Sequence, residues 1–157
     1  MVYESLVSEA EAKSIEVYEV DLKGNLLGLY RDNIVWVKKS ITTNTEKACV
    51  LAEEIGHHEL TVGNIIDQTD VRNRKQELLA RQWAYNRLIP LTSIIQAYYA
   101  KMKNRYEIAT YLGVTEPFLQ ATLNRYKDKY GLFTVINHHI IYFDPLGVVR
   151  MFEENII

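Results

Sequence analysis

The segment Cys49-Val-Leu-Ala-Glu53-Glu54-Ile-Gly-His57-His58 lies within an apolar-periodic stretch that predicts a helix. We expect this helix to open at Thr43, because Glu46 follows it at the spacing of a capping box. The apolar periodicity continues to about Leu60. This helix is expected to carry the chemistry of the protein.

Two residue types that bind metals share one face of this helix. Glu53 and His57 are four residues apart, which places them on the same side, and both carboxylates and imidazoles bind zinc. Glu54 is placed to activate a bound water, as in the protease pattern His-Glu-x-x-His. Pairing Glu54 with His58 would instead put Ile55, which cannot accept a proton, in the place of the base. The preferred reading is therefore Glu53 with His57.

In this reading, the first histidine of the protease pattern is replaced by Glu53. A set of two carboxylates and one imidazole would offset more of the metal's positive charge than two histidines and one glutamate. The metal would then be a weaker Lewis acid toward its water. We expect lower activity or an altered metal preference.

A third ligand is expected from another helix, predicted over Asp70–Ile89 and stopped by Pro90. Glu77 opens the segment Glu77-Leu-Leu-Ala80, and the small residues Ala80 and Ala84 would let this helix pack closely against its neighbour. The alternative to a metal site is that Glu53 and His57 form an ordinary i,i+4 pair on a solvated helix face.

The remaining patterns predict an α+β fold with an amino-terminal antiparallel sheet, an active-site helix, a helical middle and a carboxy-terminal β-hairpin. We expect the active cleft between the sheet and the helix. The predicted elements are a helix over Glu4–Lys13, a strand over Ile15–Val20, a hairpin of Leu27–Tyr30 and Ile34–Lys38 around Asp32-Asn33, and helices over Leu91–Met102, Glu107–Leu112 and Thr115–Tyr130. A last hairpin of Phe133–Ile136 and Ile140–Phe143 surrounds Asn137-His138-His139, and Asp144-Pro145-Leu146-Gly147 is expected to end the regular structure.

Two ordered motifs resemble the ImmA/IrrE family of metallo-endopeptidases, in particular its short phage or integrative-element type. They are the segment from Cys49 to His58 and the segment Glu77-Leu-Leu-Ala-Arg-Gln-Trp-Ala-Tyr-Asn-Arg-Leu-Ile-Pro90. The resemblance implies a gluzincin-like fold and a metal, zinc or another divalent ion, held by Glu53, His57 and Glu77. It also implies a partner, a helix-turn-helix repressor encoded nearby, which the protease cleaves or otherwise inactivates.

Two other functions stay open. One is a noncatalytic module of the same fold that binds the repressor without cutting it. The other is a small DNA-binding regulator, because the segment from Tyr106 to Leu123 mimics a helix-turn-helix. Its second helix would begin with Thr115-Glu116-Pro117, and an acidic start is poorly suited to approach phosphates. We therefore expect no direct nucleic-acid binding.

Three further sites have weaker signals. His58 could contact substrate or orient a metal ligand, although an extra histidine is more often a packing or surface residue. Cys49 could approach the metal as a thiolate or act as a redox switch, although a lone cysteine is usually a small buried apolar residue. The pair His138-His139 could serve as a transition-state donor, but turn histidines without a catalytic role are the default.

Composition bounds the class of protein. The 157 residues fit a single domain over 1–157, and the net charge of −2 supplies no broad positive field for nucleic acid or membranes. Cys49 is the only cysteine, and the chain starts without a basic-then-apolar leader. No apolar run reaches the roughly 20 residues that span a bilayer. We expect a cytoplasmic protein.

Overall fold

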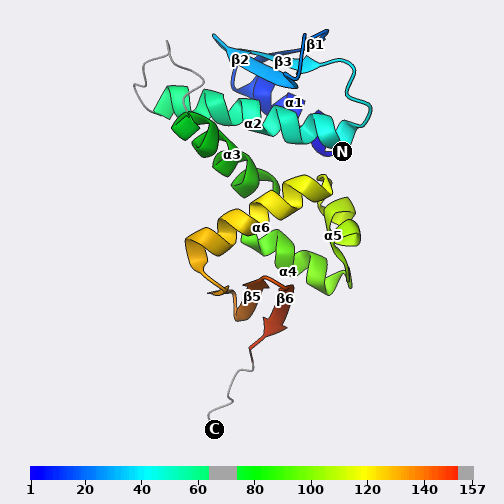
Figure 1. The fold of residues 1–157 in the computed structure, drawn as a ribbon, viewed down its shortest axis with the longest axis vertical. Coiled ribbons are helices and arrows are strands. Elements are labelled where there is room, and N and C mark those ends of the chain that lie inside the picture. The colour runs from blue at the N-terminus through cyan, green and yellow to red at the C-terminus, as the bar shows by residue number, and fades with distance from the viewer. Residues whose placement is uncertain (64–73, 152–157) are drawn as a thin grey trace.

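The computed structural model describes residues 1–63 and 74–151 (Figure 1). Its first part holds α1 (Val2–Ala12), β1 (Glu16–Val20), β2 (Gly28–Arg31), β3 (Ile34–Lys38) and α2 (Asn44–Gly63). It continues with α3 (Arg74–Leu88), α4 (Leu91–Tyr99), α5 (Arg105–Leu112), α6 (Glu116–Tyr130), β4 (Phe133–Ile136), β5 (His139–Phe143) and β6 (Leu146–Arg150). The predicted α+β class is confirmed.

The first sheet has the strand order β1-β3-β2. Strands β2 and β3 form the expected antiparallel hairpin, because Asp32 and Asn33 take the positive φ values of a tight turn, 49° and 63°. Strand β1 pairs with the free edge of β3 rather than that of β2 and runs parallel to β3, so the first sheet is mixed and not antiparallel throughout as expected. The chain crosses between these edges through residues 21–27.

Helices α1 and α2 cover one face of this sheet (Figure 1). The central strand β3 buries Val35 and Val37 completely. One of the two hydrogen bonds of the predicted capping box is found at the start of α2, where the backbone N–H of Glu46 donates to the Thr43 hydroxyl at 3.2 Å. Helix α2 then runs to Gly63, past its expected end at Leu60.

Helix α3 begins at Arg74, so the predicted start at Asp70 lies outside the described residues. The three predicted helices that follow are all present. Helix α4 stops at Tyr99, before the expected Met102, because the chain turns at Lys101, which has a φ of 63°.

Two local signals set the break between α5 and α6. Gly113 ends α5 in the left-handed conformation, with a φ of 71°. Thr115 caps α6 by accepting a hydrogen bond from the N–H of Phe118 at 3.2 Å. This turn directs α6 back toward α3, which it contacts.

The last part of the chain forms a second sheet of order β4-β5-β6. The predicted hairpin is present, with Asn137 and His138 at the positive φ values of its turn. The expectation that regular structure ends at Asp144–Gly147 was wrong. Leu146–Arg150 forms β6, because Asp144 and Pro145 make a second turn and the apolar residues that follow pair with β5.

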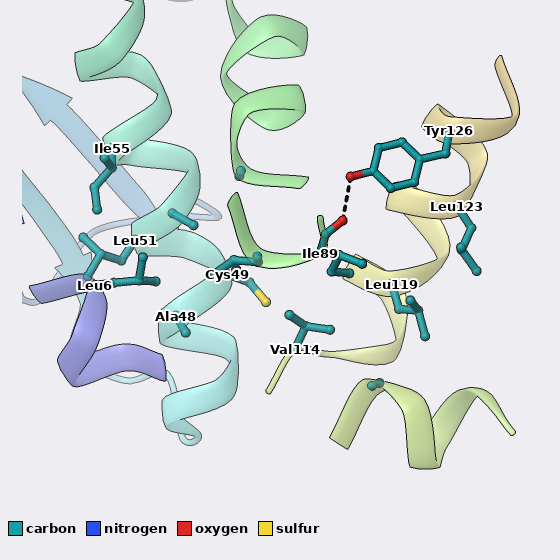
Figure 2. Close-up of a cluster of buried hydrophobic side chains, with 14 of the residues drawn as sticks. Leu6, Ala48, Cys49, Leu51, Ile55, Ile89, Val114, Leu119, Leu123 and Tyr126 are labelled. Atoms are coloured by element: carbon teal, nitrogen blue, oxygen red, sulfur yellow. Dashed lines mark hydrogen bonds between the residues drawn. The ribbon is translucent and has the colours of Figure 1, made fainter. Parts of the chain in front are cut away.

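One cluster of buried side chains extends through the described part of the chain. Figure 2 shows Leu51 and Ile55 of α2 near Leu6, and Leu119, Leu123 and Tyr126 of α6 near Ile89. The Tyr126 hydroxyl donates to the Ile89 carbonyl oxygen at 2.6 Å. Within residues 1–63 and 74–151, no helix combines the length and apolar character that crossing a bilayer requires.

Candidate metal centre

Helices α2 and α3 pack closely against each other at Gly56 and Ala80. A Cβ atom added to Gly56 would lie 2.5 Å from the carbonyl oxygen of Ala80, well inside van der Waals contact. Ala80 and Ala84 are fully buried, which confirms the expectation that small residues let this helix pack closely. The missing side chain at Gly56 therefore sets the distance between the two helices.

Replacing Gly56 with alanine is expected to lower the free energy of unfolding by about 1 to 3 kcal/mol, because the helices must separate to admit the methyl group. Inside a helix without this contact, the same change would stabilise the protein by about 0.5 to 1 kcal/mol. Urea denaturation measures the difference. Gly147→Ala is the matched control, since its added Cβ meets nothing within 4 Å. Unchanged or higher stability of Gly56→Ala would contradict the close approach.

This approach brings two of the expected ligands together. The Nε2 atom of His57 lies 3.3 Å from Oε1 of Glu77, and the His57 side chain is only 8% exposed. Glu77 lies in the first turn of α3, so its carboxylate meets α2 from the neighbouring helix. An imidazole nitrogen and a carboxylate oxygen at this separation can bind one divalent cation at about 2.0 to 2.2 Å each.

Glu53, the first position of the motif, has a different contact. Its Oε1 accepts a hydrogen bond from Nε of Arg81 at 3.1 Å. This hydrogen bond raises the pKa of Arg81, which stays charged. Arg81 follows Glu77 by four residues and so lies on the same face of α3. A fixed positive charge is thus placed beside the expected ligands.

Glu54 lies against the edge of the first sheet. A Cβ atom added to Gly28 of β2 would lie 2.6 Å from Cγ1 of Val50 and 3.0 Å from Oε1 of Glu54, so the absence of a side chain at Gly28 makes room for both side chains of α2. Burial, and then the negative charges of Glu53 and Glu77, raise the pKa of Glu54 to about 8. A carboxyl group with this pKa can both hold and release a proton near neutral pH, as an acid–base catalyst must.

The raised pKa of Glu54 predicts a pH-dependent stability for the metal-free protein. Between the unperturbed pKa of 4.5 and the folded value of about 8, the unfolded chain has lost a proton that the folded chain keeps. Glu54 therefore stabilises the fold fully below pH 4.5 and progressively less as the pH rises to 8, by up to about 1.4 kcal/mol per pH unit. In urea denaturation with chelator present, the free energy of unfolding of Glu54→Gln should rise relative to that of the parent as the pH increases across this window. The same dependence of the free energy of unfolding on pH in both proteins would contradict the raised pKa.

The arrangement fits a divalent metal in its chemistry and in part of its geometry. One imidazole and two carboxylates are suitable donors, and two of these three side chains already meet. Within residues 1–63 and 74–151, however, no three metal-binding side chains surround one point. Glu53 is turned toward Arg81 instead. The complete set of Glu53, His57 and Glu77 stays a prediction, and it requires Glu53 to leave Arg81.

His58 lies on the side of α2 that faces the sheet. Its Nδ1 shares a hydrogen bond with the Tyr30 hydroxyl at 2.9 Å, and the two rings meet edge to face. Burial lowers the pKa of His58, so the neutral form is favoured. These contacts anchor α2 to β2, next to the Gly28 contact with Glu54. A supporting role for His58 behind the metal stays a prediction.

The other candidates lie elsewhere. The Cys49 sulfur points toward the turn between α5 and α6 (Figure 2), where the thiol interacts with Thr115. Burial raises the pKa of this thiol, so the reactive thiolate is disfavoured and Cys49 acts as a buried packing residue. His138 lies in the β4–β5 turn, and His139 shares a hydrogen bond with the Tyr99 hydroxyl at 2.7 Å. Figure 1 places this hairpin at the far end of the molecule from α2 and the first sheet.

Sequence reasoning missed three residues of this centre. Arg81 was part of the second motif but was given no role, although its spacing from Glu77 shows that the two share a helix face. Gly56 occupies one of the two positions between Glu54 and His57 that the protease pattern leaves unspecified, so the pattern assigned it no role. Gly28 carried no signal at all, because its contact with Glu54 joins a strand and a helix that are distant in the chain.

The part of the chain that carries this centre matches a known family. A family model described as the IrrE N-terminal-like domain matches residues 10–124 of the 157. The chain belongs to this family. The resemblance to ImmA/IrrE proteins is thereby confirmed, and with it a function of the metallopeptidase type. Comparisons with curated proteins and with solved structures found no match.

In this IrrE N-terminal-like domain, the matched range includes the helix-turn-helix-like segment. Helix α6 buries Leu119, Thr122 and Leu123, and it packs against α3, α5, β4 and β5. Its first turn exposes the acidic Glu116. A recognition helix needs a free face with positive charge near the phosphates, so these contacts favour a structural role for α6.

Proposed function

We propose that this chain is a metal-dependent endopeptidase that inactivates a helix-turn-helix repressor, encoded nearby in a phage or mobile element, by cleaving it in the cytoplasm. The observation that carries the proposal is the 3.3 Å contact between His57 and Glu77 with Glu54 beside it. Family membership supports the metallopeptidase chemistry. The choice of a repressor as substrate rests on the resemblance of the two motifs.

In the proposed mechanism, His57 and Glu77 would hold the metal, and Glu53 would be the third ligand if it left Arg81. A bound divalent ion supplies a Lewis acid for water and for the peptide carbonyl. Burial is the main cause of the raised pKa of Glu54; neutralising Glu53 and Glu77 would remove the smaller repulsive contribution and make the proton of Glu54 easier to release. Glu54 then accepts a proton from the attacking water and donates it to the leaving amine.

A second candidate function, repressor binding without cleavage, is supported by the ion pair between Glu53 and Arg81. In that case, Arg81 provides the positive charge that balances the carboxylates, and the site serves only for recognition. The two functions differ in their need for a metal and in the fate of the repressor.

The first experiment measures metal content by elemental mass spectrometry on untagged protein, purified without chelator and also after zinc or manganese supplementation. We expect about one metal per chain, lost in His57→Ala and in Glu77→Ala. Glu59→Gln is the matched control, because Glu59 is a carboxylate on α2 that pairs with Lys13 instead. Protein that stays empty in every preparation would rule out the endopeptidase and leave the binding module.

The second experiment incubates the metal-loaded protein with the repressor and analyses the products by mass spectrometry. A truncated repressor that requires Glu54 would support cleavage. A stable complex with intact repressor, formed equally well by the parent and by Glu54→Gln, would support the binding module.

A further inference from the structure

The second sheet has one apolar face that points away from the helices. Residues directly opposite each other in paired strands project to the same side, and the register places Phe133 opposite Tyr142 and Ile140 opposite both Val135 and Val149. The other side packs against α4 and α6 and buries Ile141 and Phe143. The outer face, as we call it, consists of Phe133, Val135, Ile140, Tyr142 and Val149.

The outer face is open and carries no charge. Phe133, Val135 and Val149 are 50%, 54% and 50% exposed, and Tyr142 is 39% exposed. Gly147 lies opposite Tyr142 on the same side, and a Cβ added to it would meet nothing within 4 Å. In a soluble protein, a continuous apolar patch of this kind commonly marks a surface that another molecule covers.

We propose that the outer face is a self-association surface, on which a second copy of the chain docks so that the two sheets stack face to face. Stacked sheets lie about 10 Å apart, and their side chains interdigitate between them. A two-fold contact of this kind brings the same patch of both copies together, so the patch must complement itself.

The charge distribution favours a second copy as the occupant. A charged face would repel its own copy, because the two-fold axis opposes like charges. The outer face avoids this repulsion, since none of its five side chains can carry a charge at neutral pH. The chain as a whole carries a net charge of −2, so the uncharged face is a local feature.

The area is consistent with reversible association. An aromatic side chain offers about 150 to 250 Å² when fully accessible, so five partly exposed apolar side chains amount to several hundred Å². This lies within the range of the largest patch on a typical monomer, about 300 to 600 Å², and well below the roughly 800 Å² that each partner buries in a standard interface. We therefore expect a weak dimer rather than an obligate one.

This surface is independent of the candidate metal centre. Strands β4 to β6 follow the family-matched range of residues 10–124, and Figure 1 places them at the opposite end of the molecule from α2 and the first sheet. Failure of the metal experiments would not affect this proposal.

Sedimentation velocity at protein concentrations from about 1 to 200 µM tests the proposal with the parent and two variants. We expect a monomer–dimer equilibrium for the parent, and an association at least about tenfold weaker for Val135→Glu and for Val135→Lys, because each opposes like charges. A one-to-one mixture of these two variants should recover association as a mixed dimer. Tyr106→Glu, at a residue of α5 that is 67% exposed, should leave the parent's association unchanged.

Three results would overturn the proposal. The first is a parent that stays monomeric over the whole range. The second is a dimer that Val135→Glu does not weaken, and the third is a mixture that stays monomeric although both variants keep the parent's circular dichroism and melting temperature. A repressor that binds the parent but not Val135→Glu, while the parent itself is monomeric, would assign the face to that partner instead.

Discussion

Glu54→Gln is expected to reduce the rate of repressor cleavage by about 10²- to 10⁴-fold while leaving the metal content unchanged. Glutamine has nearly the same shape as glutamate, so it should occupy the space beside Gly28 without disturbing α2. An amide cannot accept and return a proton at neutral pH, so only the acid–base step should be lost. Single-turnover cleavage assays on metal-loaded protein measure the difference.

Two comparisons make this prediction specific. Glu59→Gln removes a carboxylate from the same helix and should cleave at the parent's rate, because Glu59 pairs with Lys13. Glu54→Asp keeps the carboxyl group but shortens its reach, and it should retain intermediate activity. Full activity of Glu54→Gln would show that another group moves the proton and would remove Glu54 from the mechanism.

Arg81→Gln is expected to raise the affinity of the metal-free protein for Zn²⁺ or Mn²⁺ by about tenfold or more. Arg81 now pairs with Glu53 at 3.1 Å, and its positive charge opposes the arrival of a cation between His57 and Glu77. Removing that charge also frees Glu53 as the third ligand. The Arg81 side chain is 54% exposed, so solvent screening keeps the expected gain modest.

Isothermal titration calorimetry of the chelator-treated protein measures this affinity directly. Arg81→Lys keeps the charge but loses the planar guanidinium, and it should bind the metal with an affinity between those of the parent and Arg81→Gln. Arg87→Gln is the matched control on the same helix, because Arg87 pairs with Glu9. Equal affinity of Arg81→Gln and the parent would show that Glu53 does not become a ligand. Absence of binding in both would count against the metal centre itself.

Local sequence signals predicted the elements of this fold better than their pairing. Asp32 and Asn33 determine the first hairpin by their turn geometry, and Gly113 and Thr115 separate two helices by capping. The parallel pairing of β1 and the presence of β6 depend instead on contacts with strands elsewhere in the chain. Pro145 looked like a terminator, but in the fold it lies in the turn that leads into β6.

The candidate centre shows the same limit. Spacing along a helix predicted that Glu53 and His57 share a face, and composition near Glu77 predicted close packing of the second helix. The direction that the Glu53 carboxylate takes depends on Arg81, which approaches from another helix and competes for it. The periodicity of one helix does not indicate which charged side chain of a neighbouring helix will contact it.

The hydrogen bond from Tyr126 to the Ile89 carbonyl has a consequence for assembly. It connects Ile89, the residue that follows α3, to α6. A side-chain contact as well as the chain itself therefore links the part of the molecule with the metal centre to the part with the outer face. In a dimer formed through the outer faces, the two centres would point outward at a fixed spacing. A substrate that is itself present in pairs would then bind at both ends, and its second contact would gain from effective concentration.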